Sequence, residues 1–149
     1  MTEILELDGT MLAGAAELEK LCFSEPWSEN SLGLLTREGG IGFAAVCDGV
    51  LAAYGGMTHV LDEGQITNIA THPDHRRRGL AEAVLGALFE YSKANGLKEI
   101  FLEVRKSNAP AIALYKKCGF ESVGERKNFY RSPTENAVLM KKILQFEGE

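Results

Sequence analysis

Hydrophobic and charged positions alternate at the start of the chain, over Ile4–Leu7, and this period of two predicts a short strand. Apolar residues then recur at helical spacing as far as Leu21, so we expect a first helix there, with Thr10 as its N-cap. Pro26 breaks this helix, and Ser28 is suited to cap a second, shorter one. A strand followed by two helices is therefore expected to open the chain.

Two runs rich in β-forming residues come next, Ile41–Cys47 and Val50–Val60. The Asp48-Gly49 pair between them favours a two-residue hairpin turn, so the runs predict an antiparallel pair. A third strand is expected over Gln65–Thr71, after a turn at residues 62–64. It ends where a histidine and a proline follow, because proline cannot continue the strand.

The longest predicted helix begins at Leu80 and runs to Asn95, where Gly96 suits the position just beyond a helix end. A strand, a helix and two strands complete the chain: Glu99–Val104, Asn108–Cys118, Phe120–Phe129 and Ala137–Leu144. Phe129 and Tyr130 are expected in a loop between the last two strands, where they wall a substrate site or pack beneath the loop. Seven strands and four helices in this order predict a mixed α/β (α+β) fold.

The length of 149 residues predicts one domain, spanning 1–149, with a single core. Hydrophobic residues make up 45% of the chain and charged residues 25%, which excludes a disordered or low-complexity protein. With 16 basic and 21 acidic residues the net charge is −5, so no global positive field exists to hold a nucleic acid. We expect no direct nucleic-acid binding, although a local basic patch could bind a small polyphosphate.

The three cysteines lie far apart and form no CxxC pair, so neither a disulfide framework nor a zinc site is indicated. The three histidines form no ligand pattern either, and we expect no metal. No signal peptide is recognised, and no apolar run approaches the ~18 residues of a membrane span. These features predict a cytoplasmic protein without membrane contact, and they leave its oligomeric state open.

A basic loop, His75–Gly79, joins the third of these strands to the longest helix. A helix start offers unpaired N–H groups and the positive end of the helix dipole, and arginines beside it add bidentate donors. This arrangement suits a phosphate group. The alternative is a solvated basic turn that only caps the helix, and neither Walker A nor G-x-G-x-x-G occurs in the chain.

Glu103 interrupts an otherwise apolar strand, and alternation puts it on the same face as Phe101 and Arg105. Partial desolvation would raise the pKa of its carboxyl toward the range of a general base, although Arg105 could oppose that shift. The alternative is a salt bridge at the strand edge. Asn108 is a natural N-cap for the next helix, and Tyr115 lies two turns further on the same face, as a half-buried core residue or a proton donor.

Two of these segments match signatures of a known family. Arg76–Ala81 is similar to the acyl-CoA signature Q/R-x-x-G-x-G/A, and Asn108–Phe120 matches N-x-x-A-x-x-L-Y-x-x-x-G-F. Together they give the whole chain a resemblance to the GCN5-related N-acetyltransferase (GNAT) family. The resemblance implies a central, mixed, mostly antiparallel seven-stranded sheet that is splayed at strands 4 and 5 and flanked by four helices. It also implies acetyl-CoA as cosubstrate.

Within the family, Ile66–Ala70, Leu102–Asn108, Arg126–Tyr130 and Pro26-Trp27-Ser28 resemble the ribosomal-protein-alanine N-acetyltransferase (RimI-like) group. That group acetylates the N-terminal alanine of small-subunit ribosomal protein eighteen, so a protein N-terminus is the implied substrate. Two positions depart from the common pattern. Ala81 replaces a glycine, and Phe129 stands where tyrosine is frequent.

The resemblance also implies roles for individual residues. Glu103 would be the general base and Tyr115 the general acid of a direct transfer without a covalent enzyme intermediate. Trp27 and Tyr130 would contact the substrate. The residues implied to bind the cofactor are Ile69, Ala70, Thr71, Arg76, Arg77, Arg78, Gly79, Leu80, Ala81 and Asn108. Two other functions stay open: acetylation of a small-molecule amine, and a catalytically silent acyl-CoA-binding module.

Overall fold

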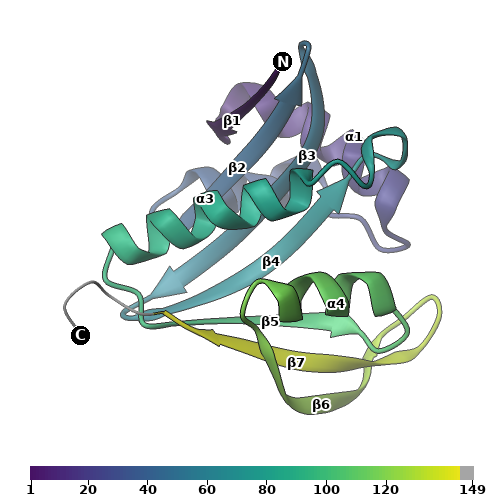
Figure 1. Cartoon of the computed structure of the whole chain (residues 1–149). Helices are drawn as coiled ribbons and strands as arrows, with labels where there is room; N and C mark the ends of the chain where they lie inside the picture. Colours follow the sequence, from purple (N-terminus) through teal and green to yellow (C-terminus); the bar gives the residue numbers. More distant parts are fainter. Residues whose placement is uncertain (145–149) are drawn as a thin grey trace.

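The computed structural model describes residues 1–144, and its centre is a seven-stranded sheet with the strand order β1-β2-β3-β4-β5-β7-β6 (Figure 1). Neighbouring strands are antiparallel except β4 and β5, which run parallel. This confirms the predicted mixed, mostly antiparallel sheet. The strands are β1 (Thr2–Glu6), β2 (Gly40–Cys47), β3 (Val50–Val60), β4 (Glu63–Thr71), β5 (Glu99–Arg105), β6 (Glu121–Tyr130) and β7 (Glu135–Ile143).

Four helices cover the two faces of the sheet, with α3 and α4 on the near face in Figure 1 and α1 behind it. They are α1 (Leu12–Cys22), α2 (Glu29–Leu32), α3 (Leu80–Ala94) and α4 (Ala109–Lys117). The strands β2, β3 and β4 contribute residues to a separate hydrophobic cluster on each face, whereas β5 and β7 contribute to the larger cluster. The larger cluster lies under α3 and α4, and the smaller one under α1 and α2. Within residues 1–144, no helix is both long and apolar enough to cross a membrane.

The sheet splits between β4 and β5, as the predicted splay requires. These strands pair only at their first residues, where Glu63–Gln65 lies beside Glu99–Phe101. A β-bulge accompanies the split, because Ile66 and Asn68 have partners on β3 whereas Thr67 between them has none. A bulge bends its strand and increases the local twist. The edge of β4 that faces β5 is therefore left without a partner strand over residues 66–71, and the two strands diverge as Figure 1 shows.

Most predicted turns and caps are confirmed. Asp48 and Gly49 have φ angles of 48° and 84°, which are the positive values that a type I′ hairpin turn needs. The side chain of Ser28 accepts a hydrogen bond from the Ser31 N–H at the start of α2. Asn108 accepts in the same way from Ala111 at the start of α4. These caps follow from local chemistry, which is why the sequence predicts them.

The N-cap prediction for Thr10 is wrong. Asp8, two residues earlier, accepts hydrogen bonds from both the backbone N–H and the hydroxyl of Thr10. This cap starts a short 3₁₀ turn, Gly9–Met11, from which α1 continues without a side-chain cap of its own. The Asp8 carboxylate binds the first free N–H groups, so Thr10 becomes a donor instead of an acceptor.

Most strands also begin or end one or two residues from the predicted positions, and two of these differences concern turns. β4 begins at Glu63, because the turn after β3 uses Leu61 and Asp62, and the positive φ of 55° falls on Leu61. Phe129 and Tyr130 end strand β6 and are not in a loop. Pairing with β7 resumes at Tyr130 opposite Glu135 after an irregularity in the ladder, a register change that the local sequence does not show.

Candidate active site

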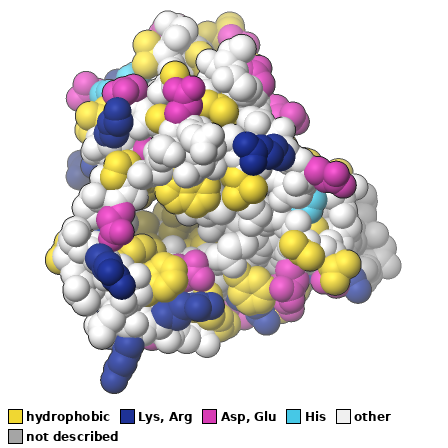
Figure 2. Space-filling view, turned by 180° about the vertical axis from the view of Figure 1, so that it is seen from behind, with side chains coloured by type: hydrophobic (Ala, Val, Ile, Leu, Met, Phe, Trp, Pro, Cys, Tyr) yellow, Lys and Arg dark blue, Asp and Glu magenta, His cyan; other side chains and the backbone are white. Residues whose placement is uncertain are grey.

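A cavity of about 580 Å³ opens where β4 and β5 diverge. Its walls come from α1 and the segment after it, from β4 and β5, from the first turns of α4 and from the end of β6. Figure 2 shows the molecule from the side opposite Figure 1, with a hollow floored by hydrophobic side chains. Six residues predicted from the sequence lie around this cavity: Trp27, Ile69, Glu103, Asn108, Tyr115 and Tyr130.

The Glu103 carboxylate lies in the wall that β5 contributes, and its side chain is 18% exposed. Gln65 donates a hydrogen bond from Nε2 to Oε2 of Glu103 over 3.0 Å. Arg126 approaches Oε1 with its Nε at 3.7 Å. The cation that contacts Glu103 is therefore Arg126, whereas the Arg105 guanidinium pairs with Glu135 at 3.2 Å. That ion pair largely neutralises Arg105, because opposite charges in contact cancel much of each other's field.

Tyr115 is 8% exposed, and its ring packs edge-on against Phe120 with 5.9 Å between ring centroids. Burial raises the pKa of its phenol well above the ordinary value, so the hydroxyl keeps its proton at neutral pH. The groups that shift this pKa include no hydrogen-bond partner from the described part of the chain. A tyrosine hydroxyl at the edge of a cavity is suited to donate to a ligand there.

The predicted cofactor segment 69–81 separates into two kinds of residue. Ile69 lines the cavity, whereas the side chains of Ala70 and Leu80 are core, at 3% and 6% exposure, and offer only backbone groups. The Thr71 carbonyl accepts from the Cys22 thiol at 3.3 Å and from Arg76 at 3.4 Å. These contacts place the end of α1 beside the start of the basic loop.

The basic loop lies at the amino end of α3, beyond the end of β4. Arg76, Arg77 and Arg78 are exposed, and Arg77 and Gly79 take positive φ angles of 65° and 76°. No side chain caps the helix start at Leu80, so the first-turn N–H groups of α3 have no side-chain acceptor. These features fit the predicted phosphate site.

The sequence reasoning did not single out Glu19, which is fully buried in α1 at the edge of the cavity. Its carboxylate accepts hydrogen bonds from Trp27 N–H at 2.8 Å, from Asn68 Nδ2 at 3.0 Å and from the Tyr54 hydroxyl. Burial and this neighbouring charge raise the pKa of Tyr54 far above its ordinary value. The signal was present in the helix spacing, because Glu19 follows the buried Ala15 by four residues and so shares its face.

Within residues 1–144, no three side chains of the types that hold metals come together. The expectation that no metal takes part stays a prediction.

The sequence model of the acetyltransferase (GNAT) family matches residues 12–120, most of the chain. The chain belongs to the GNAT family. It is therefore an acyltransferase, and the acetyltransferases of this family use acetyl-CoA. The matched residues include the basic loop, the split strands and the whole of α4.

Related proteins extend this similarity over nearly all of the chain. The [ribosomal protein bS18]-alanine N-acetyltransferase of Escherichia coli K12 is 37% identical over 142 residues, covering 94% of this chain and 96% of the relative. The crystal structure of the Escherichia coli ribosomal-protein-S18-alanine N-acetyltransferase superposes with a TM-score of 0.92, at 36% identity, over 100% of this chain and 97% of that one.

A more distant structure shares the fold alone. It is a GNAT family acetyltransferase from Elizabethkingia anophelis, solved with acetyl-CoA bound. It superposes with a TM-score of 0.79 at 20% identity, covering 96% of this chain and 98% of the other.

Proposed function

We propose that this GNAT enzyme acetylates the N-terminal alanine of a small-subunit ribosomal protein, bS18, with acetyl-CoA as donor. The observation that supports this most is the shared cavity, which Glu103 and Tyr115 both line, beside the unpaired edge of β4. The relatives that cover the chain almost end to end are named for that reaction. A ribosomal substrate also agrees with the expected cytoplasmic location.

The residues around the split suit acetyl-CoA in two ways. The free edge of β4 offers backbone groups to an extended, amide-bearing chain, as a sheet edge does to an added strand. The exposed arginines 76–78 and the uncapped start of α3 offer donors and positive charge to a pyrophosphate. Asn108 lines the cavity at the start of α4, with its side-chain oxygen engaged by Ala111 N–H at 3.2 Å.

The chemistry assigned to this chain consists of proton movements at two side chains. Acetyl-CoA supplies a thioester carbon that an amine can attack and a thiolate that can leave. Glu103 takes the first proton from the α-ammonium of the acceptor, directly or through a water, so that a free amine is available. Tyr115, whose raised pKa keeps its phenol protonated at neutral pH, gives that proton to the sulfur as the C–S bond breaks. The second proton of the nitrogen, released as the amide forms, restores the phenol.

Two aromatic side chains are proposed to contact the acceptor. Trp27 lies in the segment between α1 and α2, where the buried Glu19 holds its backbone N–H. Tyr130 ends β6, and burial, followed by the Glu103 charge, raises the pKa of its phenol to about 12. Both residues line the cavity that holds Glu103, so a peptide N-terminus bound there would lie beside them.

The test of this proposal is an acetyl-transfer assay that follows the release of free thiol. Purified protein is mixed with acetyl-CoA and one acceptor at a time: a peptide with the bS18 N-terminal sequence, the same peptide with a blocked α-amine, and a panel of polyamines and amino acids. We expect turnover with the free peptide alone. Turnover with a small amine instead would identify a small-molecule acetyltransferase. Binding of acetyl-CoA without any turnover would identify a silent module.

The variant Tyr115→Phe separates catalysis from packing. It keeps the ring against Phe120, so the melting temperature and acetyl-CoA affinity should stay near the wild-type values while turnover falls steeply. A Tyr115→Phe protein that turns over at the wild-type rate would show that another group protonates the thiolate.

A further inference from the structure

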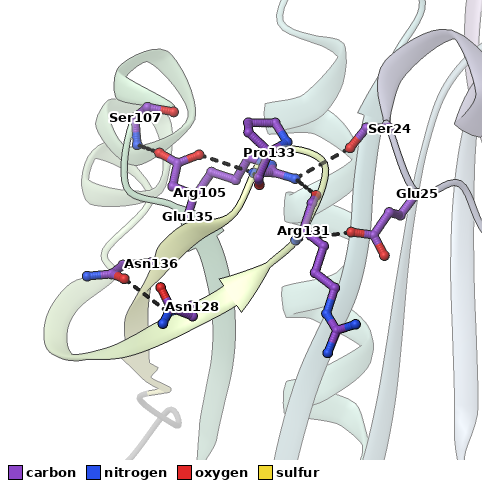
Figure 3. Close-up of polar contacts among 9 residues, drawn as sticks. All are labelled: Ser24, Glu25, Arg105, Ser107, Asn128, Arg131, Pro133, Glu135 and Asn136. Atoms are coloured by element: carbon purple, nitrogen blue, oxygen red, sulfur yellow. Dashed lines mark hydrogen bonds and ion pairs between the residues drawn. The ribbon is translucent and has the colours of Figure 1, made fainter.

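Two segments far apart in the sequence meet beside residues that line the cavity, and Figure 3 shows the polar contacts between them. One is residues 23–28, between α1 and α2, which we call the helix loop. The other is residues 131–134, between β6 and β7, which we call the hairpin loop. Glu25 of the helix loop accepts a hydrogen bond from the Arg131 N–H of the hairpin loop over 3.1 Å. The helix loop contains Trp27, and the hairpin loop directly follows Tyr130.

Arg105 joins both loops to the end of β5. In the hairpin loop its guanidinium donates to the Pro133 carbonyl at 2.9 Å and to the Arg131 carbonyl at 2.8 Å. It also reaches the Ser24 hydroxyl of the helix loop at 3.4 Å. The same group lies over the ring of Tyr130, with 4.5 Å between the guanidinium carbon and the ring centroid. Arg105 therefore contacts both loops and one of the two proposed acceptor-binding aromatics.

Glu135 completes the arrangement from the start of β7. It pairs with Arg105 at 3.2 Å and accepts from the Ser107 N–H at 2.6 Å. Hydrogen bonding by Ser107, together with Arg105, holds the pKa of Glu135 below its ordinary value, so the pair stays ionised at neutral pH. Because Glu135 neutralises Arg105, the guanidinium can line the cavity without strongly repelling a cationic α-ammonium.

The pattern of acceptors explains why arginine occupies this position. Two nitrogens of one planar group serve four oxygen acceptors on three separate segments while the face of the plane covers an aromatic ring. A lysine would keep the charge, but its single nitrogen has three donors that radiate from one point and no flat face. Replacing Arg105 with lysine therefore removes the geometry of the side chain and keeps its charge.

We propose that Arg105 is a positioning residue for the acceptor, which fixes the helix loop and the hairpin loop so that Trp27 and Tyr130 face an incoming peptide. This inference rests on the proposed function, because it assigns the part of the cavity lined by Trp27 and Tyr130 to the acceptor. Arg105 acts through the two loops and takes no part in proton transfer.

The decisive variant is Arg105→Lys, assayed for the KM of the peptide acceptor, for kcat and for the Kd of acetyl-CoA. We expect the acceptor KM to rise at least fivefold while kcat and the acetyl-CoA Kd stay within twofold. Glu25→Ala removes the second tie between the loops at an exposed position and should raise the same KM by a smaller factor. The double variant should show less than the product of the two factors, because both ties fix the same pair of loops.

Lys106→Gln is the matched control. Lys106 follows Arg105 in the sequence and forms an ion pair with Glu125 of β6 at 3.0 Å, but it does not line the cavity. Its acceptor KM should stay within twofold of the wild-type value. The proposal is overturned if Arg105→Lys leaves the acceptor KM unchanged, or if it weakens acetyl-CoA binding as much as it raises that KM. If Arg105→Lys does not fold, Glu25→Ala decides alone, and an unchanged KM there overturns the proposal.

The wild-type assay on the peptide separates the two levels of inference. Failure of the wild-type protein to acetylate any peptide rejects the proposed acceptor and, with it, this role of Arg105. Wild-type activity with an unaffected Arg105→Lys variant rejects only the positioning role.

Discussion

Removal of the buried carboxylate of Glu19 should cost more stability than removal of any other acidic side chain on α1. This residue is fully buried, and three donors converge on it: the Trp27 N–H, the Tyr54 hydroxyl and the Asn68 amide. Glu19→Ala leaves all three without an acceptor. A buried donor without a partner costs about 1–3 kcal/mol, and breaking a buried charged network by removing one member costs about 3–5 kcal/mol.

We therefore expect Glu19→Ala to lower the free energy of unfolding by about 3–5 kcal/mol, a large part of the ~5–15 kcal/mol of a typical domain. Glu19→Gln keeps one oxygen as acceptor, and the Tyr54 hydroxyl can turn to accept from the new amide. Asn68 can also flip, since its Oδ1 is buried without a partner in the described part of the chain. The expected loss for Glu19→Gln is about 1–2 kcal/mol.

The assay is urea denaturation followed by circular dichroism, with the melting temperature measured in parallel. Glu17→Gln on the same helix is the control, because Glu17 is 73% exposed and, within residues 1–144, pairs only with Lys20. A surface change of this kind should alter the free energy of unfolding by no more than about 0.5 kcal/mol. A loss below about 1 kcal/mol for Glu19→Ala, or an equal loss for Glu17→Gln, would refute the reasoning, since Glu19 would then not be the shared acceptor.

Three further predictions concern the cofactor, the base and the buried tyrosines. The double change Arg77→Glu and Arg78→Glu should raise the acetyl-CoA Kd at least ~10-fold in calorimetric titration, since charged hydrogen bonds contribute about 1.5–3 kcal/mol each. The melting temperature should not fall, because both side chains are exposed. Unchanged affinity would place the pyrophosphate elsewhere. Glu103→Gln should slow turnover at neutral pH by on the order of 10²–10⁴-fold. The defect should shrink as pH rises, because more of the acceptor is then already a free amine. Full activity of Glu103→Gln at neutral pH would mean that another group is the base. The raised pKa of Tyr54 and of Tyr115 should make stability fall once pH exceeds the ordinary value of 10.0, because the unfolded chain then loses these protons and the folded chain keeps them. Each should contribute a slope of up to about 1.4 kcal/mol per pH unit, and urea denaturation between pH 8 and 12 should show a flatter decline for Tyr54→Phe or Tyr115→Phe than for the wild-type protein.

Much of the fold could be predicted because its signals are local. The hairpin at Asp48-Gly49, the caps at Ser28 and Asn108, and the start of α3 after Gly79 each depend on a few adjacent residues. Thr10 shows where local reasoning fails. The Asp8 carboxylate, two residues earlier, accepts from both the N–H and the hydroxyl of Thr10, so the Thr10 hydroxyl acts as a donor and does not cap the helix.

The partners of the charged side chains could not be predicted in the same way. Period-two alternation correctly puts Glu103 and Arg105 on one face of β5, but it does not say which residues of other strands lie opposite. The register of β5, β6 and β7 brings Arg126 to Glu103 and Glu135 to Arg105, from 23 and 30 residues away. The register irregularity that leads into Tyr130 leaves no mark in the local sequence.

The kinds of element, their order, the loop that precedes α3 and the candidate residues for proton transfer could be predicted from the sequence, because helix period, strand alternation and caps act over a few residues. Three other features follow from tertiary contacts: β4 and β5 separate after three paired residues, Glu19 is buried at the edge of the cavity, and Arg105 joins two distant loops. These features depend on a bulge at Thr67 and on contacts between segments far apart in the chain. The packing and the hydrogen bonds that stabilise these features form only when distant segments come together in the folded chain.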